Sequence, residues 1–317
     1  MKFLFIIDPP ASLHAYKDTT VAMMRAAQAR GHAVHACGTD SLRFEAGAVR
    51  ARAARLALLE DDEDWYRADE AEDGALTAFD AVLMRKDPPF DLEYVTSTWL
   101  LSMAEREGAR VFNRPAAVRD ANEKVGILEF PDLIAPTMVA RDPARLQAFI
   151  DQQHDVILKR LDSMGGESIF RVRGGDPNRN AIMEVMAQGG ARSVMAQRYI
   201  PEIAAGDKRI LLIDGEVVPY SLARIAKPGE TRANLAAGGR GVAQPLSARD
   251  RAIAETVGPV LAARGLLVGG LDVIGAWLTE VNVTSPTCFR EIQDQAGFDV
   301  SGLFIEAVEA KVKGGPS

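Results

Sequence analysis

Cysteine and long apolar stretches are the features that this sequence has least of. Only Cys37 and Cys288 occur among 317 residues, too few for a disulfide framework, so we expect a reducing compartment and a cytoplasmic protein. No stretch approaches the roughly 20 consecutive apolar residues of a membrane-spanning helix. The apolar run Phe3–Ile7 stops at an aspartate and is too short for the core of a signal peptide. A membrane partner is therefore not expected.

An excess of basic residues is also missing. The chain has 37 Lys and Arg against 44 Asp and Glu, a formal net charge of -7. Residues 60–73 contain nine acids and one arginine, a local charge of -8, which leaves the rest of the chain at +1. Such an acidic run is typical of a solvated face or a mobile loop. Nucleic acid is not expected as a partner, because binding its phosphates needs a concentrated basic surface.

Several motifs of common enzyme classes do not occur. The chain has no G-x-x-x-x-G-K-[ST] phosphate loop, no strand-linked G-x-G-x-x-G and no G-x-S-x-G turn. Its histidines lack the spacing of a metal site; they are His14, His32, His35 and His154. These absences argue against a hydrolase with a catalytic triad and against zinc chemistry.

The first 121 residues have the pattern of a parallel α/β layer. Continuous apolar runs predict buried strands, and the segments between them have helical character with a glycine at the end of the first helix. We expect strands over 3–7, 33–37, 81–84 and 109–112, and helices over 21–30 and 94–107. This unit, residues 1–121, is expected to be an α/β N-terminal domain.

The remaining chain changes to an α+β pattern. Strands are expected over 155–159, 168–172, 194–199, 209–213 and 216–222, with two more in 268–283 and helices over 181–187, 252–264 and 303–312. The first two of these strands are close in sequence and are therefore antiparallel partners. Asp214-Gly215 between two apolar runs favours a tight primed turn. We expect two α+β subdomains, residues 122–200 and residues 201–317.

A lysine and two glycines suggest one site for phosphate. Gly165 and Gly166 lie in a turn that follows Lys159, where backbone N–H groups could approach an anion beside an ammonium group. A tight hairpin with an exposed lysine is an equally good interpretation of this segment.

The strongest local signal is a group of oxygen-bearing side chains near the C-terminus. Glu280 and Asn282 lie two apart on a strand and so share a face, and Asp272 lies on the preceding strand. Such oxygens suit Mg²⁺ shared with substrate phosphates. A two-residue connection would put Asp272 and Glu280 on opposite faces, so we predict a three-residue connection or an equivalent bulge. An exposed polar face is the structural alternative.

Arginines recur in the same half of the chain. Arg209 begins one strand of the Asp-Gly hairpin and Arg224 follows the other. Arg232 and Arg240 lie in the glycine-rich segment 227–241, which has no periodicity. We interpret this segment as a lid that closes over an anionic ligand, with an ordinary surface loop as the alternative.

Taken together, these residues resemble the ATP-grasp superfamily, and within it the bacterial glutathione synthetase family. The resemblance covers essentially the whole chain. It is carried by the stretches MRKDPPFD (84–91), RDANEK (119–124), GDKR (206–209), NLAAGGRG (234–241) and EVNVTSPT (280–287). The expected fold is thus an α/β N-terminal domain followed by an ATP-grasp fold of two α+β subdomains, the first of which covers the nucleotide.

The resemblance also implies roles for individual residues. Nucleotide contacts are implied for Lys124 and Lys159 at the phosphates, Gly165 and Gly166 above them, Gln197, Arg198, Tyr199 and Ile200 at adenine, and Asp207 at the ribose. Metal ligands are implied to be Asp272, Glu280 and Asn282. Arg209 is placed beside the transferred phosphoryl group, with Arg224 and Arg240 also catalytic. Contacts to the peptide substrate are implied for Arg85, Arg224, Arg232, Arg240 and Ser285.

The implied reaction joins γ-glutamylcysteine and glycine to form glutathione, with ATP as co-substrate and Mg²⁺ or Mn²⁺ as cofactor. An acyl phosphate forms first, and the glycine amine then displaces phosphate; no protein nucleophile is needed. A homo-oligomer is also implied. Two alternatives stay open: a ligase of the same fold for another acid or amine, and a non-catalytic ATP-binding relative.

Overall fold

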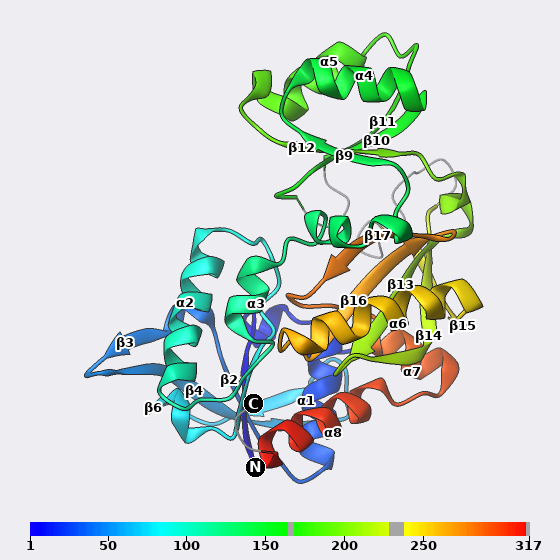
Figure 1. The fold of residues 1–317 in the computed structure, drawn as a ribbon. Coiled ribbons are helices and arrows are strands. Elements are labelled where there is room, and N and C mark those ends of the chain that lie inside the picture. Colours follow the sequence, from blue (N-terminus) through cyan, green and yellow to red (C-terminus); the bar gives the residue numbers. More distant parts are fainter. Residues whose placement is uncertain (164–167, 228–237, 315–317) are drawn as a thin grey trace.

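The computed structural model describes residues 1–163, 168–227 and 238–314, and three sheets organise the fold (Figure 1). The first sheet has the strand order β3-β4-β2-β1-β7-β8, with β5 and β6 also paired to β4. Its strands are β1 (Lys2–Ile6), β2 (Ala33–Cys37), β3 (Arg43–Glu45), β4 (Ala48–Leu58), β5 (Tyr66–Ala68), β6 (Glu72–Ala75), β7 (Ala81–Met84) and β8 (Val111–Phe112). The helices of this part are α1 (Thr19–Ala29), α2 (Leu92–Arg106) and α3 (Pro115–Asp120).

The predicted parallel layer is confirmed, but it is only half of this sheet. Strands β2, β1, β7 and β8 run parallel, whereas β4 pairs antiparallel with β2. Residues of β4 alternate between the core and the surface, with Val49, Ala51 and Ala53 buried. Alanine and arginine are weak strand formers, so this long strand is stabilised by its neighbours rather than by its own composition.

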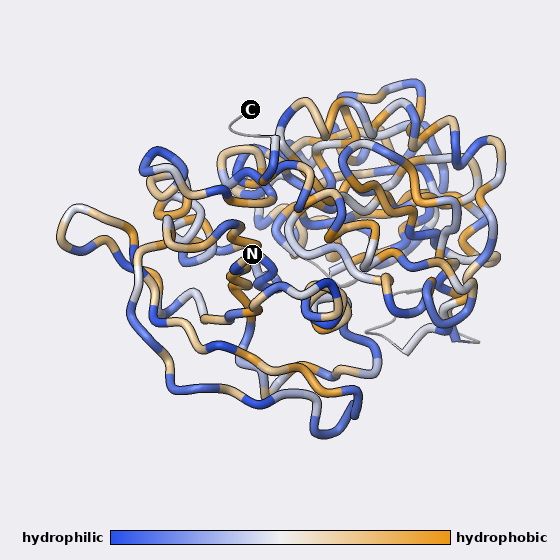
Figure 2. The backbone as a smooth tube through the Cα atoms, turned by 90° about the horizontal axis from the view of Figure 1, so that it is seen from below, coloured by the Kyte–Doolittle hydropathy of each residue, from blue (hydrophilic) through white to orange (hydrophobic). Residues whose placement is uncertain are grey.

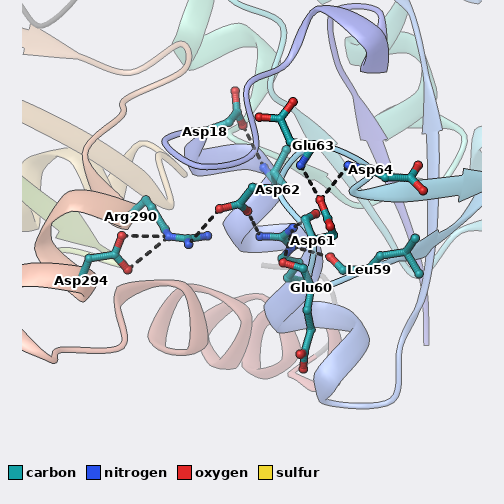
Figure 3. Close-up of polar contacts among 11 residues, drawn as sticks. Asp18, Leu59, Glu60, Asp61, Asp62, Glu63, Asp64, Arg290 and Asp294 are labelled. Atoms are coloured by element: carbon teal, nitrogen blue, oxygen red, sulfur yellow. Dashed lines mark hydrogen bonds and ion pairs between the residues drawn. The ribbon is translucent and has the colours of Figure 1, made fainter.

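The acidic stretch that follows β4 is held in place by Arg25 and Arg290, and Figure 3 shows Arg290 beside Asp62. The Arg25 guanidinium donates to the Leu59 carbonyl at 2.9 Å and to the Asp62 carboxylate at 2.7 Å. Asp62 also lies 3.5 Å from Arg290, and the Asp61 carboxylate accepts two backbone N–H groups of its own loop. The acids are thus largely solvated, as expected, but their loop is tied to α1 and to a helix of the C-terminal half.

The second sheet forms a separate lobe, which lies above the rest of the molecule in Figure 1. Its antiparallel order is β11-β10-β12-β9. The elements are β9 (Thr137–Ala140), α4 (Pro143–Gln153), β10 (Asp155–Arg160), β11 (Ile169–Arg173), α5 (Arg179–Ala187) and β12 (Val194–Arg198). Strands β10 to β12 and α5 confirm the prediction, whereas β9 and α4 were not predicted. Both helices pack on one face of the sheet through a small apolar core of their own.

The third sheet is antiparallel, with the order β15-β14-β13-β16-β17. Its elements and the remaining helices are β13 (Asp207–Ile213), β14 (Glu216–Ile225), β15 (Arg240–Pro245), α6 (Ala248–Ala263), β16 (Val268–Ile274), β17 (Trp277–Asn282), α7 (Phe289–Ala296) and α8 (Val300–Lys313). Asp214 and Gly215 both have positive φ, +51° and +82°, which confirms the primed turn. Helix α6 covers one face of the sheet, where Ile210, Leu212 and Leu271 meet the apolar side of the helix.

The C-terminal helix returns to the N-terminal domain. Helix α8 lies along α1 (Figure 1). Glu309 of α8 accepts hydrogen bonds from the Arg30 Nε and from the His32 ring, both at 2.8 Å. Hydrophobic stretches run mainly through the packed interior, and hydrophilic ones mainly through the outer loops (Figure 2).

Each of the three sheets lies within one of the expected ranges 1–121, 122–200 and 201–317, and the division into domains stays a prediction. No helix in the described part of the chain combines the length and the apolar character that crossing a membrane requires.

Candidate active site

The face of the third sheet opposite α6 carries charged side chains in adjacent register. Arg209 of β13 lies directly opposite Asp272 of β16, and Asp207 lies opposite Arg224 of β14. Paired residues of antiparallel strands project from the same face, and so do residues two apart on one strand. Four charges of alternating sign are therefore brought together by strand pairing alone.

Direct ion pairs connect these four residues. Arg209 holds the Asp272 carboxylate through Nε at 2.5 Å and Nη2 at 3.1 Å, and Arg224 Nη2 reaches the same carboxylate at 2.8 Å. The other neighbour of Arg224 Nη2 is the Asp207 carboxylate. Burial alone would raise the pKa of Asp272, but the two guanidinium charges outweigh it and hold that pKa well below its usual range. Asp272 is therefore a permanent carboxylate.

A glycine makes room for this arrangement. A Cβ at Gly270 would lie 2.9 Å from Arg209 Cδ and 3.0 Å from Pro286 Cβ. The arginine thus crosses the sheet over Gly270, beneath the turn that contains Ser285 and Pro286. A larger residue would displace the guanidinium that binds Asp272.

The predicted register of the last hairpin is confirmed in its bulged form. Gly275 and Ala276 form a two-residue connection, because Ile274 pairs with Trp277. The register then shifts at Thr279, an extra residue that brings Glu280 opposite Asp272. The Thr279 hydroxyl donates to the Asp272 carbonyl at 3.0 Å, which stabilises the bulge.

Glu280 is surrounded by both signs of charge. Burial first, and then the neighbouring carboxylate of Glu123, raise the pKa of Glu280 to about 7, although Lys159 and Lys124 oppose this rise. Glu123 is brought there by its backbone, whose carbonyl accepts the N–H of Val281 at 2.8 Å. Both predicted phosphate lysines are therefore close enough to the predicted metal ligand to influence its pKa.

The donor set of this face fits a divalent cation. Asp272 and Glu280 are directly opposite, Asn282 shares their face opposite Gly270, and all three supply oxygen. Within the described ranges no group of three or more His, Cys, Asp or Glu residues could hold a metal ion by itself. A cation here would thus need Asn282 and oxygens of a bound anion as well, which is the usual arrangement for magnesium. A bound cation would also favour the charged form of Glu280, and it would therefore offset the rise in pKa that burial and Glu123 cause in the protein alone.

The expected nucleotide contacts on the upper lobe are partly engaged with the protein. Lys159 Nζ lies 3.4 Å from Gln197 Oε1, and the buried Lys124 ammonium donates to Glu123 and to the Ser163 carbonyl. The backbone N–H groups of Arg198 and Tyr199 donate to the carbonyls of Pro136 and Asp155, both at 2.9 Å. For the Ile200 N–H no acceptor is found in the described part of the chain, so this group is the one free to meet a base.

Arg85 and Ser285 are brought together, and within the described part of the chain the hydrogen-bond partners of the Arg85 guanidinium are Thr20 and Pro286 rather than the ion-pair residues. Arg85 is buried, and its guanidinium donates to Thr20 Oγ1 at 3.2 Å and to the Pro286 carbonyl at 2.9 Å. Ser285 Oγ lies 3.4 Å from the Arg85 carbonyl. Burial lowers the pKa of Arg85, and the charges of Asp87 and Asp18 are the largest effects that oppose this. Arg85 therefore ties the Ser285–Pro286 turn to the N-terminal domain.

Arg240 does not belong to this cluster. It is exposed at the first position of β15, opposite Ile225, whereas Gly241 is opposite Arg224. Alternation along the strand directs the Arg240 side chain to the other face of the sheet. Gly165, Gly166 and Arg232 lie outside the described residues, as does most of the predicted lid, residues 228–237.

Two further residues near the cluster were not predicted as part of the site. Glu291 in the first turn of α7 has a raised pKa because of burial, and Arg209 is among the charges that lower it. The Cys288 thiol is buried beside Arg209 and Arg224, and burial raises its pKa, so it is a protonated neighbour rather than a nucleophile. Sequence reasoning missed Glu291 because α7 was not predicted, and it missed Glu123 although that residue adjoins Lys124 in the RDANEK stretch.

Two family models match most of the chain. The model of the prokaryotic glutathione synthetase N-terminal domain covers residues 1–119, and that of the prokaryotic glutathione synthetase ATP-grasp domain covers residues 123–297.

Curated relatives match over nearly their full length. The glutathione synthetase of Bordetella pertussis is 59% identical over 98% of this chain and 99% of its own length. That of Ralstonia nicotianae is 56% identical over 99% of this chain and 98% of its own length, and that of Neisseria meningitidis serogroup B is 54% identical over 98% of each.

Solved structures share the fold at low identity. D-cycloserine synthetase DcsG superposes with a TM-score of 0.69 at 16% identity, over 98% of this chain and 99% of that chain. The ATP-grasp ligase PsnB in complex with a minimal precursor, Mg and ADP has a TM-score of 0.62 at 18% identity, over 98% of each chain. The predicted ATP-grasp fold is thereby confirmed, and the chain belongs to the prokaryotic glutathione synthetase family.

Proposed function

We propose that this chain catalyses the ATP-dependent joining of γ-glutamylcysteine and glycine to form glutathione. The cysteinyl carboxylate of γ-glutamylcysteine attacks the γ-phosphorus of ATP, and the bond from that phosphorus to the oxygen that bridges it to the β-phosphorus breaks. The glycine nitrogen then attacks the acyl carbon, inorganic phosphate leaves, and the amine loses a proton. Glutathione, ADP and phosphate are the products.

The first step phosphorylates only one of the two carboxylates of γ-glutamylcysteine. γ-Glutamylcysteine contains a cysteinyl carboxylate, which reacts, and a glutamyl α-carboxylate, which stays intact and is available for binding; glycine enters only in the second step. Both steps gather negative charge on phosphate and carboxylate oxygens. Fixed cations that are already in place stabilise such charge without reorganisation.

One observation carries the proposal: Arg209 and Arg224 are buried side by side on the face that also presents Asp272 and Glu280. A buried guanidinium pair is costly unless an anion meets it. In the protein alone, Asp272 meets both guanidinium groups. We assign Arg209 to the transferred phosphoryl group and Arg224 to the reacting carboxylate.

The nucleotide is proposed to lie at the junction of the upper lobe and the third sheet. Lys124 and Lys159 would bind its phosphates, and their shared influence on the pKa of Glu280 supports a common position. The backbone of residues 197–200 would meet adenine, in particular through the Ile200 N–H. Asp207 would meet the ribose, since its Oδ1 is buried without a partner in the described part of the protein.

Asp272, Glu280 and Asn282 would hold Mg²⁺ or Mn²⁺. Such an ion, when bound, neutralises charge on the triphosphate and polarises its oxygens. Arg85, Arg232 and Ser285 are retained as candidates for the peptide substrate, whereas Arg240 is not, because its side chain is directed to the other face of the sheet. For Arg85 the support is indirect, because its guanidinium contacts the Pro286 carbonyl rather than the ion-pair cluster.

The test is release of inorganic phosphate from ATP with defined pairs of acid and amine. We expect turnover with γ-glutamylcysteine and glycine, and at least a hundredfold less with D-alanine alone or with γ-glutamylcysteine and a bulkier amino acid. Turnover with another pair but not with this one would identify a different ligase of the same fold. ATP binding without phosphate release from any pair would identify a non-catalytic relative.

We further propose that the protein is a cytoplasmic homo-oligomer. The two buried free cysteines agree with a reducing compartment. Leu92 and Trp99, seven residues apart on α2, are 68% and 50% exposed, which supports contact of this face with another copy. Light scattering coupled to size-exclusion chromatography tests the assembly, with Trp99→Glu expected to lower the mass.

A further inference from the structure

Asp207 has a second set of contacts that a role in ribose binding does not use. Its Oδ2 accepts from Arg224 Nη2, and its backbone carbonyl lies 3.4 Å from Arg224 Nε. The two residues are direct cross-strand neighbours in the ladder of β13 and β14. The Nε–Nη2 edge of the Arg224 guanidinium is therefore held by one residue, through its side chain and its backbone.

The approach of these two strands is itself specialised. Gly206, immediately before Asp207, has φ of +113°, and a Cβ there would lie 3.2 Å from the Arg224 carbonyl and 3.3 Å from Ile225 Cγ1. Only glycine allows this backbone conformation and this approach without strain. The start of β13 is thus pressed against the end of β14 at the point where Asp207 meets Arg224.

Asp272, the other carboxylate that binds Arg224, has further partners and so does not orient this arginine by itself. Both oxygens of Asp272 accept from Arg209, Oδ2 is shared with Arg224, and Asp272 is also a proposed metal ligand. Each acceptor site that Asp272 gives to a cation is lost to the arginines. Asp207 is outside the proposed metal set, so its hold on Arg224 does not compete with cation binding.

We propose that Asp207 is a positioning residue for Arg224, which it orients toward the reacting carboxylate of the acid substrate. This inference rests on the proposed function, because it concerns the arginine assigned to that carboxylate. It adds to the ribose contact and is separable from it, since Oδ2 faces Arg224 whereas Oδ1 is without a partner among the described residues.

The test combines a double-mutant cycle with altered nucleotides, using the full-length protein. Asp207→Asn is expected to lower kcat/KM for γ-glutamylcysteine at least tenfold with ATP, and by a similar factor with 2′-deoxy-ATP and 3′-deoxy-ATP. In an Arg224→Lys background, Asp207→Asn is expected to cost less than twofold more. Where turnover of Arg224→Lys is too slow, the dissociation constant of γ-glutamylcysteine measured by calorimetry replaces kcat/KM in the cycle.

A matched control is a second buried carboxylate, which contacts β13 from the opposite face of the sheet. Asp250 of α6 is buried and pairs with Lys208, the neighbour of Asp207. Asp250→Asn should lower the melting temperature but leave kcat/KM within twofold of the wild-type value. A general structural role of Asp207 would instead make the two variants alike.

Two results would overturn the inference. A loss on Asp207→Asn that is present with ATP and absent with the deoxy nucleotides would assign Asp207 to the ribose alone. An equal loss in the wild-type and Arg224→Lys backgrounds would show that Asp207 does not act through Arg224. Failure of the proposed function is a separate outcome, because the wild-type protein would then not turn over γ-glutamylcysteine and glycine at all.

Discussion

Replacing Glu280 by glutamine should abolish ligation and yet make the ligand-free protein more stable at alkaline pH. The carboxylate of Glu280 has a pKa of about 7 in the folded protein, against an ordinary value of 4.5. Below pH 4.5 the carboxyl group is protonated in both the folded and the unfolded chain, so glutamine and glutamic acid are nearly equivalent. Between pH 4.5 and about 7 the folded state binds more protons than the unfolded state, so its stability falls as the pH rises.

The magnitude follows from that interval. Each pH unit between the two pKa values costs about 1.4 kcal/mol, so the wild-type protein loses roughly 3 kcal/mol of unfolding free energy that Glu280→Gln retains. Urea unfolding in EDTA, followed by tryptophan fluorescence, measures this difference at pH 4.5 and at pH 8. Trp277 lies on β17 together with Glu280 and reports on this sheet.

Asp272→Asn is the contrasting variant for the same assay. It should also abolish turnover, but it removes the carboxylate that neutralises Arg209 and Arg224, and breaking a buried ion pair costs about 3–5 kcal/mol. Two proposed ligands of one cation should thus have opposite effects on the ligand-free protein. The reasoning is refuted if Glu280→Gln is no more stable than wild type at pH 8, or if its advantage is the same at pH 4.5.

Three further variants test the packing around the site and the domain contact. Gly270→Ala should reduce kcat at least tenfold, because the added Cβ would lie 2.9 Å from Arg209 Cδ; unchanged steady-state kinetics would contradict this. Gly215→Ala should lower the unfolding free energy by about 1–3 kcal/mol with kcat unaffected, since φ is +82° and its Cβ would lie 2.9 Å from Ala262. Glu309→Gln should cost about 1–2 kcal/mol at pH 7 through lost hydrogen bonds to Arg30 and His32. Hydrogen bonding to Arg30 first, and then to His32, lowers the pKa of Glu309 to about 2, so this cost should shrink as the pH falls from 5 toward 2. A cost that is independent of pH would contradict the ion pair.

Elements with a strong local pattern could be predicted from the sequence. Runs such as Phe3–Ile7 and the Asp214-Gly215 turn depend on burial and backbone preferences that neighbouring residues determine. Strand β4 and helix α7 were missed for the converse reason. The first is built largely from alanine and arginine, and the second is an eight-residue helix of mostly polar sequence, so both are stabilised by the parts of the protein that they contact.

In the candidate site, too, some features could be predicted from the sequence and others could not. Alternation along a strand was enough to place Glu280 and Asn282 on one face, and the need for an odd register was enough to predict a bulge or a longer connection. Which of the two occurs depends on pairing over the whole hairpin. The structure has the bulge at Thr279.

The sequence by itself therefore determined which of the candidate side chains share a strand face, because alternation along a strand repeats every two residues. Only the tertiary structure decided that Glu123 joins Glu280, that Asp207 holds Arg224 and that Arg85 is buried against Pro286. These contacts join segments far apart in the chain. They depend on strand order and on the packing of one sheet against its neighbours, which no local pattern encodes.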